Sequence, residues 1–338
     1  MRVIGARLGQ WFPGTGLAAV IALAATSVST LHGGPQLLYA LFFGVAFNYL
    51  SEEPRTKPGI DLCARGLLRL GVALLGARIT TAQIVALGWP TALITVAGVV
   101  TTIGLGLVLG RRLRMSAAQG VLSGGAVGIC GASAALAISA VLPREKEGDG
   151  FTVMVVVTVT VLSTLAMVLY PLIAKVLTLP PELAGLFIGA TIHDVAQVVG
   201  AGYTLGSDTG DVAIIVKLFR VSLLAVVVVI VAMAFKAARA RPHDRDGNGA
   251  PVRQALVPWF LWVFVAMVAL NSAGALATQV QGALTDISRA CLVMAIAALG
   301  TKTSFMQLAR AGWRPFVLIL VETVWLAGLV LLCALLAW

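Results

Sequence analysis

The chain carries little charge. Only 11% of its 338 residues are Asp, Glu, Lys or Arg, whereas a typical soluble domain has about 25%. The low charge excludes an ordinary soluble domain, and it also excludes a long disordered region, which would be polar and highly charged. Hydrophobic residues make up 59% of the chain and form continuous runs, unlike the short alternating strands of a membrane β-barrel. The composition therefore predicts an all-α polytopic membrane protein.

Several chemical motifs are also missing. The sequence has no Walker P-loop, no HExxH or GxSxG motif, no paired carboxylates for hydrolysis and no TVGYG-type filter. We therefore expect no enzymatic activity, no catalytic residues and no cofactor. The cysteines form no CxxC pair, which is typical of small core residues rather than metal ligands, so we expect no metal site. They are Cys63, Cys130, Cys291 and Cys333.

The net charge is +10. In a soluble protein this excess would suggest a nucleic-acid partner. In a membrane protein, Lys and Arg instead collect in cytoplasmic loops, and the sequence has neither zinc-finger spacing nor a basic helix. We therefore expect membrane lipid, and no nucleic acid, as a partner of this chain.

Hydropathy predicts about eleven transmembrane helices of roughly 20 residues each. They lie near 14–31, 35–50, 63–84, 91–110, 119–142, 151–176, 183–204, 211–236, 255–276, 286–308 and 315–337. We interpret the first as an uncleaved helix, although Arg2 and Arg7 precede it as they would a signal peptide. Nearly all other loop cations fall on the N-terminal side, and the opposite side holds only Arg144, Lys146 and Arg289. This asymmetry predicts a multi-pass protein of the bacterial inner membrane, with the N-terminus cytoplasmic and the C-terminus outside.

We expect one transmembrane transporter domain over residues 1–338. Its first half would be residues 1–176 and its second half residues 183–338. The one long polar segment, residues 237–254, falls inside the second half and is predicted to be a cytoplasmic linker.

A short internal repeat relates residues 73–90 to residues 297–315. The matched pairs are Gly76 with Gly300, Arg78 with Lys302, Thr80 with Ser304, and Gln83 with Gln307. The two segments are seven predicted spans apart, so they would cross the membrane in opposite directions. Inverted-topology repeats around a midplane site are typical of secondary transporters.

Residues 122–142 are rich in glycine and other small residues. Each glycine weakens a helix by up to about 1 kcal/mol relative to alanine, and interrupted helices are tolerated in membranes where they line a cavity. A half-helix that begins near Gly131–Ser133 would direct free N–H groups at an anion. The predicted substrate-binding residues here are Gly128, Cys130, Gly131 and Ser133. Close packing of small residues between helices is the alternative.

Residues 185–202 place two ionisable side chains, His193 and Asp194, at the centre of a predicted span. Intramembrane ionisable residues are candidates for function, and both groups can bind a proton, while a carboxylate can also bind sodium. Gln197 is four residues from His193 and shares its helical face. We predict that these three residues couple transport to an ion; a hydrogen-bonded pair that braces the bundle is the alternative.

The predicted spans hold more cations than acids. Each charge costs about 2.5–3.5 kcal/mol at a helix centre, so an anionic substrate would offset the excess. Lys217 could instead snorkel to the outer surface, and Glu322 could pair with a cation or serve a purely structural pair. The cations are Arg78, Lys217, Arg220 and Lys302, and the acids are Asp194 and Glu322.

The motifs together resemble those of the YeiH-type family of proposed sulfate exporters. They are GVALLGARIT (71–80), GICGASAALA (128–137), GATIHDVAQVVGAG (189–202), KLFRVSLL (217–224) and LGTKTSFMQLARAGWRP (299–315). The resemblance covers most of the chain from about residue 30. It implies a place in the wider group of cation/proton antiporters and anion transporters, with inverted repeats and crossed, interrupted helices. Residues 122–142 and Gly300–Ser304 are the expected interruptions. The resemblance also implies glutamate at the position of Asp194, where aspartate has a shorter reach.

We therefore predict a secondary transporter that exports a small anion, such as sulfate or a sulfonate, by alternating access around a midplane site. A proton or sodium ion is the candidate coupling ion, and a homodimer is a candidate assembly. The alternatives are a proton- or sodium-coupled cation antiporter and a passive anion channel. Besides residues 128–133, the predicted anion-binding residues are Arg78, Arg220, Lys302 and Ser304.

Overall fold

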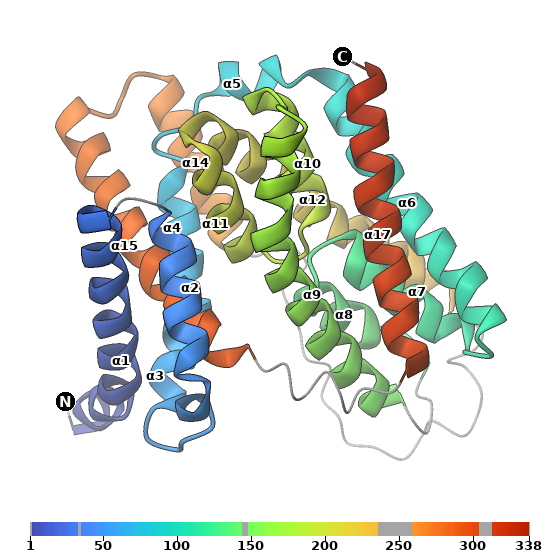
Figure 1. Ribbon diagram of the computed structural model, residues 1–338, viewed down its shortest axis with the longest axis horizontal. Coiled ribbons are helices and arrows are strands. Elements are labelled where there is room, and N and C mark those ends of the chain that lie inside the picture. The colour runs from blue at the N-terminus through green and yellow to red at the C-terminus, as the bar shows by residue number, and fades with distance from the viewer. Residues whose placement is uncertain (1, 33–34, 144–147, 236–258, 304–312, 338) are drawn as a thin grey trace. The chain divides into compact units, whose positions relative to one another are not determined.

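A computed structural model describes residues 2–32, 35–143, 148–235, 259–303 and 313–337 (Figure 1). All regular elements within these ranges are helices, in agreement with the predicted all-α membrane protein. The chain divides into two compact units, each assembled from separate stretches of sequence. Unit 1 comprises Met1–Gly88, Val199–Asp211 and Pro258–Ser304, and unit 2 comprises Trp89–Val198, Val212–Val257 and Phe305–Trp338. Both units draw on both predicted halves of the chain, and the halves themselves remain a prediction.

Unit 1 is organised around one long helix, α15. Its longer helices are α1 (Arg2–His32), α2 (Gln36–Ala46), α4 (Leu68–Leu75), α14 (Trp259–Ser272) and α15 (Thr278–Lys302). Shorter elements are the 3₁₀ turn η1 (Asn48–Ser51), α3 (Lys57–Asp61), the π-helical η2 (Leu62–Leu67) and α5 (Thr81–Ala86). Helix α15 packs against α1, α2 and α4, and α14 packs against α4 (Figure 1).

Glycines allow the central helix to approach its neighbour closely. A Cβ atom added to Gly300 of α15 would collide with the backbone of Leu41 and Gly44 in α2. A Cβ atom added to Gly44 would in turn collide with the backbone of Ala297 and Gly300. Small residues at such contacts are the usual device for packing helices in membranes, where burial from water supplies no force between helices.

Helices α4 and α15 run in opposite directions. The Ser288 hydroxyl donates to the Gly71 carbonyl (2.6 Å), and the Gln281 amide donates to the Ala77 carbonyl (3.1 Å). Residues later in α15 therefore face residues earlier in the α4 region. The two segments of the predicted internal repeat end these two helices, so within unit 1 they are antiparallel, as an inverted repeat requires.

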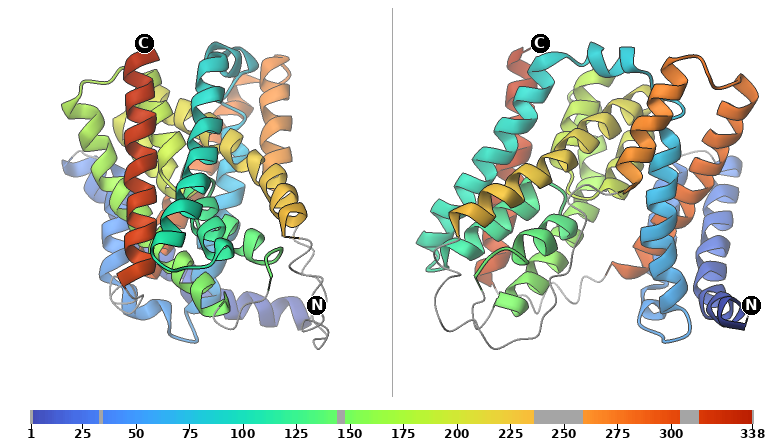
Figure 2. Two further views of the ribbon diagram at one scale, coloured as in Figure 1. Left: turned by 90° about the vertical axis from the view of Figure 1, so that its right-hand side faces the viewer. Right: turned by 180° about the vertical axis from the view of Figure 1, so that it is seen from behind.

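Unit 2 contains two interrupted helices. Its elements are α6 (Gly88–Arg112), α7 (Ala117–Gly128), α8 (Ala132–Ser139), α9 (Gly148–Val176), α10 (Pro181–Thr191), α17 (Trp313–Ala337) and most of α12 (Ser207–Ala234). Helix α11 (Val195–Leu205) begins in unit 2 and ends in unit 1. Helix α17 packs against α7, α9 and α10, and α7 packs against α8 and α9 (Figure 2).

The predicted spans coincide with helices, but only some are long and continuous. Within the described ranges, six helices are long and apolar enough to cross a membrane, and three further apolar helices are shorter. The six are Gln10–His32, Gly88–Arg112, Gly150–Val176, Ser207–Ala234, Thr278–Lys302 and Trp313–Leu336. These helices support a multi-pass membrane protein, and the count of eleven crossings remains a prediction.

Three expected boundaries differ from the structure. The span predicted over residues 63–84 ends at Leu75, because Thr80 and Gln83 form a capping box that starts the separate helix α5. The span predicted over 183–204 is broken at residues 192–194. At Gly300–Ser304, where the sequence predicts an interruption, α15 ends at Lys302, and residues 304–312 lie outside the described part of the chain.

The glycine contact gives a test of the packing in unit 1. We expect Gly300→Ala to lower the free energy of unfolding by about 1–3 kcal/mol, because the new methyl group overlaps backbone atoms of α2. Gly282→Ala is the matched control on the same helix, since no atom lies within 4 Å of an added Cβ there. Thermal unfolding of both purified variants in detergent measures the difference. Equal stability of the two variants would contradict the predicted contact.

Candidate functional site

The two helix breaks of unit 2 lie side by side. The first separates α7 from α8 at residues 129–131, where Gly131 has a φ angle of +64°, a conformation that favours glycine. The second separates α10 from α11 at residues 192–194. A Cβ atom added to Gly131 would lie only 3.4 Å from the Cβ atom of His193, so the two breaks are adjacent. The interruption predicted near Gly131–Ser133 is therefore present, and it meets a second one.

Lys217 of α12 joins the two breaks. Its side chain is fully buried, and its ammonium group donates to the carbonyl oxygens of Ile129 (2.8 Å), Ile192 (2.9 Å) and His193 (2.6 Å). An ammonium group has three N–H donors, so all of them are used. Lys217 thus satisfies backbone carbonyls of both breaks and does not snorkel to a surface.

Arg220 lies one helical turn further along α12 and binds the same breaks. Its Nε donates to the Gly128 carbonyl (2.5 Å), Nη1 donates to Ile192 (3.1 Å), and Nη2 donates to Val127. The last carbonyls of a helix carry partial negative charge and have no partner within the helix. Lys217 and Arg220 therefore neutralise the carbonyl ends of α7 and α10, and the Arg220 predicted to bind an anion contacts backbone in this conformation.

The opposite, N–H ends of the breaks differ from each other. Helix α11 is capped, because the Asp194 carboxylate accepts from the Ala196 N–H (2.8 Å). The Ser163 hydroxyl oxygen accepts from the N–H groups of His193 (3.2 Å) and Asp194 (3.1 Å). Helix α8 starts after Gly131, which has no side chain to cap it, and its second residue, Ser133, is exposed. Among the described breaks, the positive end of α8 is thus the one whose N-cap residue offers no capping side chain.

The predicted coupling residues sit in different surroundings. His193 and Gln197 are fully buried, with His193 Nε2 3.0 Å from Thr323 Oγ1 and the Gln197 amide donating to Thr164 Oγ1 (2.8 Å). Asp194 is partly exposed. In this conformation His193 and Gln197 connect the second break to α17 and α9, and Asp194 is the partly accessible acid.

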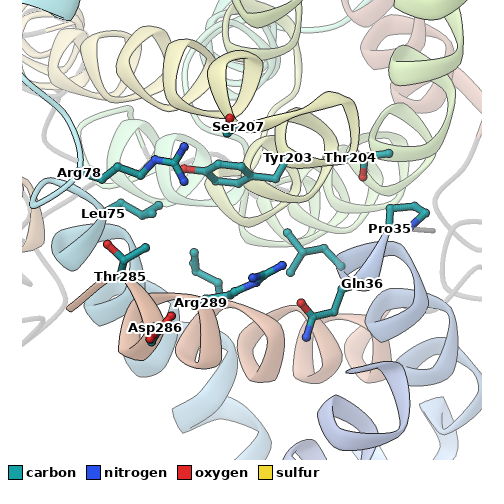
Figure 3. Close-up of a pocket in the computed structure, with 12 residues that line it drawn as sticks. Pro35, Gln36, Leu75, Arg78, Tyr203, Thr204, Ser207, Thr285, Asp286 and Arg289 are labelled. Carbon is teal, nitrogen blue, oxygen red and sulfur yellow. The ribbon is translucent and has the colours of Figure 1, made fainter. Parts of the chain in front are cut away.

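Arg78 lies in unit 1, at the edge of a cavity of about 290 Å³ (Figure 3). Its Nε donates to Asp211 (3.0 Å), which also accepts from the Tyr203 hydroxyl (2.7 Å), and its guanidinium lies over the Tyr203 ring. Among the described residues, the terminal Nη groups of Arg78 form no further hydrogen bond. Arg289 reaches into the cavity from α15. The cavity wall therefore offers two guanidinium groups to a small ligand.

Lys302 lies in unit 1 at the far end of α15 and forms an ion pair with Asp61. The two cations of the internal repeat thus each bind an aspartate at the end of a helix. Ser304 lies outside the described residues. Unit 2 brings together Gly128, Cys130, Gly131, Ser133, His193, Asp194, Gln197 and Arg220 from the predicted set.

Several functional candidates carry little signal in the sequence. Asp211 is the first residue of a predicted span, and Arg289 counts among the loop cations. Tyr203 and Ser163 carried no signal, because a hydroxyl group within an apolar helix is common. The position of Asp211, a carboxylate at the boundary of a predicted span, is the one sequence feature that indicates a partner for Arg78.

Comparisons with known proteins identify relatives over nearly the whole chain. A family model described as conserved hypothetical protein 698 matches residues 13–319. The chain is 46% identical over 326 residues to a UPF0324 membrane protein of Chlorobaculum tepidum, covering 96% of this chain and 89% of the relative. It is 46% identical over 317 residues to the UPF0324 membrane protein TauZ of Paracoccus pantotrophus, covering 94% and 92%. No solved structure shows a match.

The bonds of Lys217 predict a large effect on stability. We expect Lys217→Met to lower the free energy of unfolding by about 3 kcal/mol or more, because each orphaned buried carbonyl costs about 1–3 kcal/mol. Lys175→Met, at an exposed position in the last turn of α9, is the control and should change stability little. Thermal unfolding in detergent measures both. A Lys217→Met protein as stable as the control would refute the role assigned to Lys217.

Proposed function

The chain belongs to the UPF0324 family of membrane proteins, the YeiH-type family that its motifs resemble, and from that premise we propose that it is a secondary transporter of a small anion. The proposal includes no chemical conversion of the substrate and no cofactor. It places the N-terminus in the cytoplasm, as the distribution of loop cations favours.

The observation that carries this proposal is the charge at the paired breaks. Lys217 and Arg220 are fully buried there, and their described partners are backbone carbonyls rather than acids. Asp194 is the one acid at the breaks within the described residues, and its carboxylate caps α11. Two cations and the positive end of α8 therefore face one carboxylate, which favours an anion over a cation at this point.

Each residue then has a proposed role. The N–H groups at the start of α8, beside Gly131 and the exposed Ser133, would contact the anion. Lys217 and Arg220 would act through the backbone, holding the breaks in position and supplying positive potential. Asp194 is partly exposed and its carboxylate caps α11. An ion that binds to this carboxylate would therefore affect the start of that helix.

The substrate class is a further part of the proposal. Sulfate and sulfonates are compact oxyanions with several acceptor atoms, which suit a cluster of N–H donors. Two relatives from Paracoccus species carry the name TauZ, which supports the choice of a sulfonate as a candidate substrate. The direction of export comes from the family resemblance alone.

Transport by purified protein in liposomes tests the proposal. We expect saturable uptake of labelled sulfate or methanesulfonate that competing oxyanions block. Asp194→Asn and Ser133→Ala, both at the breaks, should each reduce uptake, whereas Arg111→Ala, an exposed cation at the end of α6, should not. Normal uptake by both break variants would overturn the site. Sodium- or proton-driven cation movement without anion uptake would establish the antiporter, and large uncoupled currents would establish a channel.

A further inference from the structure

Glu322 is a buried acid without a cation. It lies on α17, is 0% exposed, and its Oε1 atom is 2.8 Å from the Ser123 hydroxyl of α7. Its Oε2 atom has no hydrogen-bond partner among the described residues. The ion pair that sequence analysis offered for Glu322 is therefore not formed within the described part of the chain.

The hydrogen bonds around Glu322 are short of one proton. Ser123 has a single hydroxyl hydrogen, yet its oxygen lies within bonding distance of both the Gly120 carbonyl (3.2 Å) and Glu322 Oε1 (2.8 Å). If Glu322 carries a proton, it donates to Ser123, and Ser123 donates to Gly120. Both contacts are then complete hydrogen bonds without any bifurcation.

The packing of α6 and α7 beside Glu322 leaves space for its carboxyl group and for little else. A Cβ atom added to Gly106 of α6 would lie 2.6 Å from Glu322 Oε1 and would collide with the Gly120 carbonyl. Helices α6 and α7 thus approach each other through glycine beside the acid. A long basic side chain from either helix cannot enter this space.

No charge on the neighbouring helices balances an ionised Glu322. Helix α7 has no ionisable residue, and the described ionisable side chains on the other packed helices form no ion pair with it. These are Arg111 and Arg112 of α6, Tyr170 and Lys175 of α9, and Glu182 of α10. His193, in the break between α10 and α11, contacts Thr323 and not Glu322. Lys217 and Arg220 are bound to carbonyls. A buried carboxylate without a counter-charge costs several kcal/mol, so this packing favours the neutral acid.

Glu322 is connected to both broken helices. Ser123, its partner, lies on α7 five residues before that helix ends at Gly128. The next residue of α17, Thr323, contacts His193 at the second break. Gain or loss of a proton at Glu322 therefore changes contacts of α17 with both segments that form the breaks.

We propose that Glu322 is the proton-binding site that couples anion transport to the proton gradient, an inference that rests on the proposed transport function. In the present conformation the carboxyl group holds the proton. In a conformation that admits water to the α7–α17 contact, the acid releases this proton and becomes a carboxylate. Because α17 contacts both breaks, proton binding and release at Glu322 are linked to the positions of α7 and of the second break.

Glu322→Gln tests this assignment, because the amide keeps the shape of the neutral acid and cannot release a proton. We expect exchange of labelled for unlabelled sulfate across liposomes to persist. Accumulation driven by a pH gradient should fall roughly tenfold or more, the size of a typical coupling between two sites. Glu182→Gln, an exposed acid in the first turn of α10, is the control and should keep the gradient response. Wild-type accumulation by Glu322→Gln would overturn the assignment.

A second measurement separates this inference from the function itself. Infrared difference spectra over a pH series should show the carbonyl band of a protonated carboxyl group in the wild type and its loss in Glu322→Gln. Glu322→Asp is the second variant, for use if Glu322→Gln folds poorly. Because it keeps an acid, it should retain the carbonyl band at a shifted position. If the band is found but no tested anion is transported, the proton site stands and the transport proposal fails. No band attributable to Glu322 would refute the proton site.

Discussion

The contact of two buried cations with backbone carbonyls is the constraint on which unit 2 depends. A helix can break inside a membrane only if its freed polar groups find partners. Lys217 and Arg220 provide six donor contacts in total to carbonyls of the two breaks. This arrangement leaves the N–H ends of the breaks available for other partners. The two buried side chains also give the cluster its positive character.

The buried or partly buried cations of unit 1 have a different kind of partner. Arg78 binds Asp211 and Lys302 binds Asp61, so each charge is balanced by an acid at the end of a helix. The antiparallel arrangement of α4 and α15 puts these two pairs at opposite ends of the unit. Close glycine contacts between α2 and α15 make this part densely packed. The same chain therefore contains cations bound to acids in one unit and cations bound to backbone in the other.

Sequence analysis predicted the helical class and the break near Gly131, because glycine weakens helices locally. It missed the break at residues 192–194, where Ile, His and Asp carry no helix-breaking signal. That break depends on tertiary partners: Lys217 and Arg220 bind its carbonyls, and Ser163 binds its N–H groups. The count of surplus cations pointed to Lys217 and Arg220 but not to their partners, because backbone carbonyls were not considered among them. Residue types identified the ionisable candidates, but only the fold could assign their contacts.

The order of the chain gives the Lys217 contacts a consequence for biosynthesis. Helices α7, α8, α10 and the start of α11 all precede α12 in the sequence. Their broken ends therefore leave the ribosome before the side chains that satisfy them. Until residues 217–220 are inserted, these segments hold polar backbone groups that the bilayer cannot solvate. Pairing of these carbonyls must wait for α12, so the insertion of this helix is the step of biosynthesis that stabilises the two breaks.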